Sequence, residues 1–131
     1  MKNYLLKLCI ISISLLLIGC PDDDEFDIKF KIINETPNTI YIMYDHQVDF
    51  SSSIFPKPTD KYSIPSLDAA TYTTQSQWFD QNRILRILVV EERIFVNYEW
   101  EYILSEELYT RIDLTKEGLQ NIDFEIVYNG E

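Results

Sequence analysis

Glycine, cysteine and histidine are scarce in this chain. Its 131 residues include 3 glycines, 2 cysteines and 1 histidine. Few glycines argue against a glycine-rich loop that cradles phosphate. A zinc site normally uses three or four nitrogen or sulfur ligands, which this composition hardly provides. We therefore predict no cofactor and no metal site.

Basic residues are also few. The chain has 11 Lys and Arg against 22 Asp and Glu, which gives a formal net charge of −11. Such a chain repels phosphate backbones, so we predict no nucleic-acid partner. It is not attracted to anionic lipid either, so a membrane link must be hydrophobic or covalent. The 46% hydrophobic content predicts a folded domain rather than a disordered chain.

The longest apolar run lies at the N-terminus. Lys2 and Lys7 supply positive charge, and residues 8–18 are apolar apart from two serines. A bilayer core needs about 20 apolar residues, so this run is too short to span it. Its length and its basic start are typical of a secretory signal peptide.

The end of this run resembles the bacterial lipobox. Leu17, Ile18 and Gly19 precede Cys20, with an aliphatic residue at −3 and a small residue at −1. The resemblance implies cleavage between Gly19 and Cys20, a diacylglyceryl group on the Cys20 sulfur and acylation of the new amine. An uncleaved signal anchor, or an ordinary signal peptide with a chance cysteine, is the alternative. We predict a signal peptide over residues 1–19 and membrane attachment through lipid on Cys20.

An acidic run follows the predicted lipid site. Pro21 precedes Asp22, Asp23, Asp24 and Glu25. A calcium loop spaces its ligands on alternate residues and turns on glycine, which this run does not do. We predict an extended tether over residues 20–25, because like charges repel. The run also resembles the signal that sends lipoproteins of Bacteroidetes to the outer face of the outer membrane. This second resemblance implies a protein of the cell envelope. It favours the outer membrane, and whether the domain is exposed at the cell surface is not decided.

The remaining residues, 26–131, predict one β-rich domain. Alternating or β-branched runs indicate strands over residues 26–33, 39–44, 61–65, 69–75, 83–92 and 121–128. We expect the first two strands to form a hairpin. Residues 83–92 are apolar on both faces, as in a central strand covered on both sides. Residues 93–97 continue or pair with that strand, and the loop over residues 45–60 includes a short edge strand near Ile54.

The period changes toward the C-terminus. Trp100 lies on the apolar face of a predicted helix over residues 99–108, and Thr115 caps a second short helix over residues 115–121. We predict a mostly β fold, a single antiparallel β-sandwich-like domain with one or two short helices near the C-terminus. The alternative is an α+β fold in which one antiparallel sheet is backed by the helix over 99–108.

Two segments resemble a group of small lipoproteins of unknown function from Bacteroidetes. They are IINETPNTIYI, residues 32–42, and the run over residues 98–128. The matching positions in the second segment are Trp100, Arg111, Asp113, Leu114 and Thr115, whereas Gly118 departs from an expected acidic residue. The resemblance implies a cell-envelope lipoprotein and brings no catalytic residue with it.

Few residues suggest chemistry. His46 lies between Asp45 and Asp49 in the sequence. It could be a metal ligand or a base whose pKa the neighbouring acids tune. The alternative is an exposed histidine in a loop, and this is what we predict. A glycosidase needs two carboxylates at a fixed separation. The candidates are Glu91, Glu92, Glu99, Glu101, Glu106 and Glu107. In so acidic a chain most of these are solvated, so we predict no enzymatic activity.

Trp78 is the one candidate for contact with a ligand. Its polar neighbours, among them Gln77 and Asp80, suit a ring that stacks on a sugar, whereas the alternative is a core plug at a sheet edge. We predict that Trp100 lies in the core. The expected function is a non-enzymatic, lipid-anchored binding or structural module. A glycan-binding accessory module is the alternative, and an enzyme with a carboxylate pair is third. Whether the partner is a protein or a glycan is left open.

Overall fold

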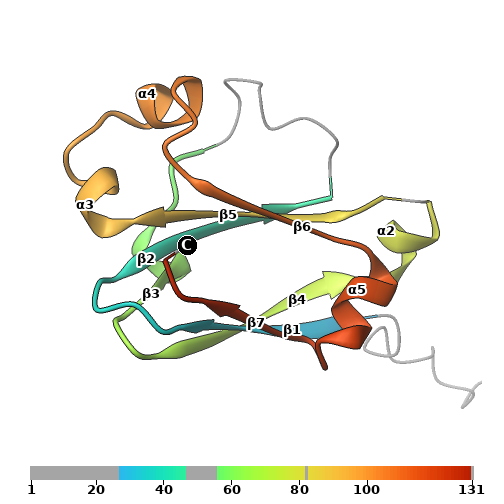
Figure 1. The fold of residues 1–131 in the computed structure, drawn as a ribbon. Helices are drawn as coiled ribbons and strands as arrows, with labels where there is room; N and C mark the ends of the chain where they lie inside the picture. The colour runs from blue at the N-terminus through green and yellow to red at the C-terminus, as the bar shows by residue number, and fades with distance from the viewer. Residues whose placement is uncertain (1–26, 47–55, 82, 131) are drawn as a thin grey trace, which may run out of the picture.

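The domain is built from two packed β-sheets (Figure 1). The computed structural model describes residues 27–46, 56–81 and 83–130. Sheet A has the strand order β4 (Ala69–Gln75), β1 (Asp27–Asn34) and β7 (Glu125–Tyr128). Sheet B has the order β3 (Ser63–Ile64), β2 (Ile40–Asp45), β5 (Leu85–Glu91) and β6 (Thr110–Leu114). The predicted mostly β, sandwich-like domain is confirmed.

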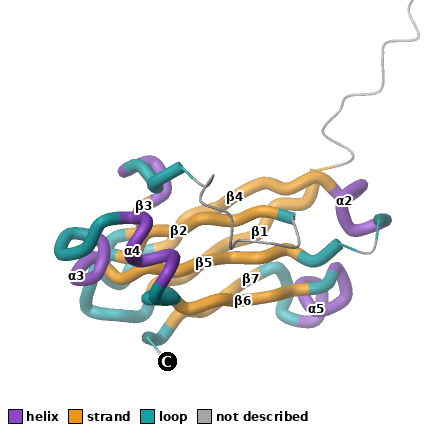
Figure 2. Tube along the Cα trace, turned by 90° about the horizontal axis from the view of Figure 1, so that it is seen from above, coloured by secondary structure: helices purple, strands orange, loops and turns teal. Residues whose placement is uncertain are grey.

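Short helices lie at the ends and on one face of the sandwich. They are η2 (Asp60–Tyr62), α2 (Ser76–Asp80), α3 (Glu92–Phe95), α4 (Trp100–Ser105) and α5 (Lys116–Asn121). Figures 1 and 2 show α2 and α5 at one end, where each carries the chain between the sheets, and α3 and α4 at the other. In the described ranges, no helix is long and apolar enough to cross a bilayer.

The main core lies between the two sheets. It is filled from alternate positions of the strands, including Phe30, Ile32, Ile40, Ile42, Leu85, Ile87, Val89 and Ile126. On the opposite side of β5, Val90 packs with Trp100 and Ile103 of α4 in a second cluster. β5 is therefore covered on both faces, as its sequence predicts. Trp100 is 4% exposed, which confirms that it is a core residue.

Two predictions of strand pairing need correction. β1 and β2 do not form a hairpin, because they belong to different sheets. The turn between them carries the chain across the sandwich, held by the buried Asn34, whose Nδ2 donates to the carbonyls of Asn38, Ile64 and Pro65. β1 also pairs with β7 in parallel, with Ile32 opposite Ile126. Both strands start at the end where α2 and α5 lie, so they run in one direction (Figure 1).

Element types and boundaries also differ in places. Residues 93–97 do not extend a strand, since α3 occupies Glu92–Phe95. The last strand begins at Glu125 rather than at residue 121, because Asp123 and Phe124 have φ angles of 51° and 60° that end α5 in a tight turn. Helices α2 and α3 are additions to the two predicted helices. The predicted edge strand near Ile54 lies outside the described residues.

The predicted cap of the last helix is present. Gly118 N donates to Thr115 Oγ1 at 3.0 Å. A Cβ at position 118 would lie 3.3 Å from that same oxygen, tighter than an ordinary van der Waals contact. The glycine that departs from the expected acidic residue therefore leaves room for the cap.

Candidate functional site

The predicted lipid site lies outside the described residues. This holds for Gly19, Cys20 and the run from Asp22 to Glu25, which all stay predictions. The described chain starts at Asp27, opposite Gln75 at the end of β4. Gln75 directly precedes α2. A tether at the N-terminus therefore joins the domain at the end that carries α2 and α5.

His46 is not an exposed loop residue, so that prediction is wrong. It is 6% exposed, and its Nε2 lies within hydrogen-bond reach of Thr74 Oγ1. Its ring is perpendicular to the Phe79 ring, with 4.9 Å between the centroids. Burial lowers the pKa of His46, which the Asp45 carboxylate opposes and the Arg83 guanidinium reinforces. Within the described ranges, no three Asp, Glu, His or Cys side chains gather as metal ligands.

Trp78 lies half-buried in α2, next to His46. Its ring is nearly parallel to the His46 ring at 6.0 Å, and the Arg83 guanidinium lies 4.9 Å from its centroid. Trp78 Nε1 donates to Gln75 Oε1 at 3.0 Å. Since Arg83 lies over the ring, a sugar that stacks on that face has to displace it. Trp78 is thus a partly exposed side chain that contacts His46, Arg83 and Gln75, and it does not fill the core at a sheet edge.

Two of the carboxylates considered for a glycosidase pair line the same surface depression. Glu91 and Glu107 both line a pocket of about 270 Å³ beside Tyr109. Glu91 Oε2 accepts a hydrogen bond from Arg93 Nε at 2.7 Å. Burial raises the pKa of Tyr109, and Glu107 adds to that increase. The remaining candidates, Glu92, Glu99, Glu101 and Glu106, are exposed.

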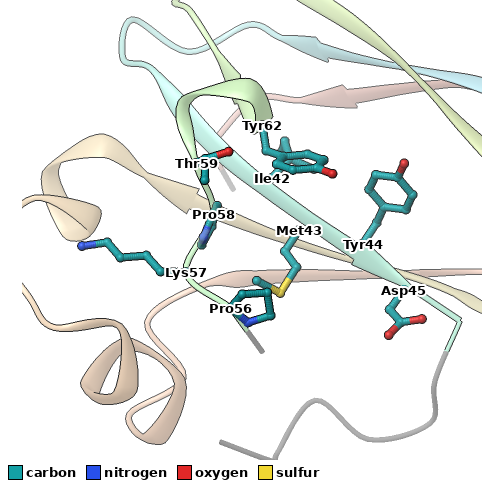
Figure 3. A pocket seen from close by; sticks show the side chains of 9 residues that line it. All are labelled: Ile42, Met43, Tyr44, Asp45, Pro56, Lys57, Pro58, Thr59 and Tyr62. Atoms are coloured by element: carbon teal, nitrogen blue, oxygen red, sulfur yellow. The ribbon is translucent and has the colours of Figure 1, made fainter. Parts of the chain in front are cut away.

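A larger pocket opens beside β2, and we call it the edge pocket. Its volume is about 440 Å³. Its lining consists of Ile42, Met43, Tyr44, Asp45, Pro56, Lys57, Pro58, Thr59 and Tyr62 (Figure 3). Ile42 and Tyr44 pack with the core between the sheets, whereas Met43 packs with the cluster on the outer face of sheet B. Because both faces of β2 contribute, the pocket lies at the edge of the strand.

The wall opposite β2 carries two prolines. Pro56 and Pro58 flank Lys57, so this stretch offers one backbone N–H where three are usual. Pro58 is buried. The Lys57 ammonium points away from β2 and lies 4.7 Å from the centroid of the Phe95 ring (Figure 3). Proline disfavours strand pairing, which explains why this wall stands apart from β2.

Tyrosines border the pocket on the core side. Tyr44 and Tyr62 line it, and the ring of Tyr72 lies 5.4 Å from Tyr44 and 6.4 Å from Tyr62. Tyr44 OH donates to Thr73 O at 3.2 Å. Tyr72 OH is buried and has no hydrogen-bond partner among the described residues. Burial raises the pKa of Tyr72 to about 12, and the other two phenols add to the increase.

Sequence reasoning missed the edge pocket. A loop over residues 45–60 was expected, and its prolines were visible, but pocket formation depends on how far β3 extends along β2. The helical turn η2, at Asp60–Tyr62, comes directly before β3, so only Ser63 and Ile64 pair with β2. Comparison with protein-family models, with curated proteins and with solved structures found no match.

Proposed function

We propose that the protein is a lipid-anchored component of the cell envelope whose single domain acts as a non-enzymatic binding module. The lipobox resemblance at Leu17 to Cys20 supports the anchor, and the edge pocket supports the binding role. A volume of about 440 Å³ falls within the range typical of ligand sites, roughly 300–1,000 Å³. The pocket is the observation that carries the assignment of binding.

The anchor sets how the domain is presented. Residues 20–25 reach about 20 Å when fully extended, which keeps the domain close to the bilayer. The tether joins the domain at Asp27, beside α2, so this end faces the membrane. Helices α3 and α4 lie at the far end (Figure 1). The edge pocket then lies on the flank of the domain, open to partners in the same compartment.

Metabolic labelling with a fatty-acid analogue tests the anchor. We expect the wild-type protein to carry the label and Cys20→Ser to lose it, because only the Cys20 sulfur provides the thioether. Cys9→Ser is the matched control, since Cys9 lies inside the predicted signal peptide, and this variant keeps the label. Label retained by Cys20→Ser would show that the proposed anchor is wrong.

Glycan binding is the second candidate. The observation that favours it is that Trp78 is partly exposed, with the exposed Gln77 and Asp80 beside it. A glycan array probed with the protein tests this function. Binding that disappears in Trp78→Ala supports it, whereas an array without signal, or with signal unchanged in Trp78→Ala, excludes this site.

A further inference from the structure

We propose that the edge pocket accepts an extended peptide segment of a partner protein, which adds a strand to sheet B along β2. This inference rests on the proposed function, since it specifies what the binding module binds. Three observations carry it: an unpaired stretch of β2, the open space beside that stretch, and the charge of the groups around it.

The first observation is the short reach of β3. It pairs only with Ile40 and Tyr41, and among the described residues no other strand pairs with this edge of β2. On the opposite edge, β2 pairs with β5 over its full length from Ile40 to Asp45. Among the described residues, the last four residues of β2 are therefore paired on one side only.

The ladder with β5 shows which backbone groups face the pocket. Glu92 N donates to Thr39 O at 2.9 Å, so Thr39 directs its backbone groups toward β5. In an antiparallel pair this direction alternates from one residue to the next. Tyr41, Met43 and Asp45 follow Thr39 and face β5, so Ile42 and Tyr44 direct their N–H and C=O groups toward the edge. These groups are donors and acceptors for an added strand.

The second observation is that space is available beside these groups. The pocket separates Ile42–Asp45 from the proline-containing wall, and adjacent strands lie about 4.8 Å apart. Pro56 and Pro58 have no N–H, so these two positions of the wall donate no hydrogen bond to β2. An incoming strand of about four residues matches the unpaired length of β2, and main-chain hydrogen bonds supply affinity in strand addition.

The third observation is charge, and it selects the occupant. Two charged side chains line the pocket: Asp45 lies at one end, and the Lys57 ammonium is directed at the Phe95 ring rather than at β2 (Figure 3). The formal net charge of −11 opposes docking of a second copy of the chain. We infer that the bound peptide places apolar side chains against Met43 and Pro56, and a Lys or Arg side chain near the Asp45 carboxylate.

Amide hydrogen exchange on the full chain, purified in detergent, tests strand addition. The probes are peptides of the form Lys-X-Thr-X-Lys in which X is Val, Ile, Leu or Phe. We expect exchange at the Ile42 and Tyr44 amides to slow at least about tenfold with saturating peptide, since these N–H groups become donors. Peptides that are N-methylated at alternate residues keep their side chains but cannot pair, and we expect them to leave exchange unchanged.

A charge swap tests the chosen occupant. We expect Asp45→Lys to bind the corresponding Glu-X-Thr-X-Glu peptides in preference to the lysine peptides, as measured by fluorescence anisotropy. Glu117→Lys, on the exposed face of α5, makes the same change of charge at a distant position and keeps the original preference.

The outcomes separate this inference from the function on which it rests. If none of the lysine peptides slows exchange at Ile42 and Tyr44, or if N-methylated peptides act equally, strand addition is wrong while the lipid anchor stands. If Asp45→Lys and Glu117→Lys behave alike, the assignment of a basic partner is wrong. Loss of the lipid anchor is detected separately, by fatty-acid labelling.

Discussion

At the scale of single residues, Asn34 links three segments of the fold. Its side chain is fully buried and donates to the carbonyls of Asn38, Ile64 and Pro65. Its Oδ1 accepts hydrogen bonds from the backbone N and the hydroxyl of Thr36. A buried polar group left without a partner costs about 1–3 kcal/mol. The amide therefore fixes the turn that takes the chain from sheet A to sheet B.

We expect Asn34→Ala to lower the free energy of unfolding by about 2–4 kcal/mol, since it leaves several buried groups unpaired. Asn38→Ala is the matched control. Asn38 is exposed, and its contribution to the network comes from its backbone carbonyl, so we expect a change under about 1 kcal/mol. Urea unfolding followed by circular dichroism measures both. Equal losses for the two variants would contradict this role of Asn34.

His46 predicts a pH dependence of stability. Its folded pKa is lowered from the usual value near 6.5, chiefly by burial. The unfolded state then binds the proton more readily than the folded state, so stability is complete above about pH 6.5 and falls as the pH drops toward the folded pKa. Between pH 7.5 and pH 5.5 we expect a loss of at most about 1.4 kcal/mol.

Denaturant unfolding at these two pH values measures the effect. His46 is the only histidine, so His46→Gln removes the one side chain that ordinarily titrates in this window. We expect the variant to be less stable at pH 7.5 but nearly independent of pH over the range. A wild-type protein that gains stability on acidification would show that the sign is wrong.

Residue-level prediction succeeded where local pattern is sufficient. Trp100 was predicted in the core from helical spacing, and Thr115 was predicted as a cap from its position before a short helix. The burial of His46 was not predictable, because it depends on Thr74 and Phe79, which are distant in sequence. The network of Asn34 likewise joins residues 30 positions apart.

At the scale of elements, the sequence identified most strands but not their partners. β5 was recognisable as a central strand because both of its faces are apolar. Pairing is a property of the whole chain, so adjacency in sequence wrongly suggested a β1–β2 hairpin. The late start of β7 is local, yet it arises from two consecutive left-handed residues, Asp123 and Phe124. Aspartate adopts this conformation more often than most residues, but phenylalanine does not, so the pair does not mark the turn in the sequence.

The turn that leads into β4 provides a test of backbone strain. Leu67 is 77% exposed and has a φ angle of 57°. A left-handed conformation costs a residue with a Cβ about 1–2 kcal/mol. Substitution by glycine removes this cost, but the larger conformational entropy of glycine in the unfolded state cancels part of the gain. We expect Leu67→Gly to raise the free energy of unfolding by about 0.5 kcal/mol. Leu67→Ala keeps the Cβ, so we expect no gain, and equal stability of the two variants would contradict the assigned strain.

At the scale of the whole molecule, sequence and structure inform different parts of the proposed function. The location rests on residues 1–25, whereas the binding role rests on the folded domain that follows. The edge pocket lies beside the part of β2 that the two-residue β3 does not reach, and its far wall contains two prolines. Neither feature marks a ligand site when the sequence is considered alone.

The intact mass of the protein purified from membranes tests the lipid anchor most directly. We predict a mature chain that begins at Cys20 and carries the added mass of a diacylglyceryl group, with or without a third acyl chain on the amine. Alkaline hydrolysis of the two ester-linked acyl chains should leave the chain from Cys20 onward with a glyceryl group on the Cys20 sulfur, and with the amide-linked acyl chain where the amine is acylated. A mature chain that begins at any other residue, or one of unmodified polypeptide mass, would contradict the account.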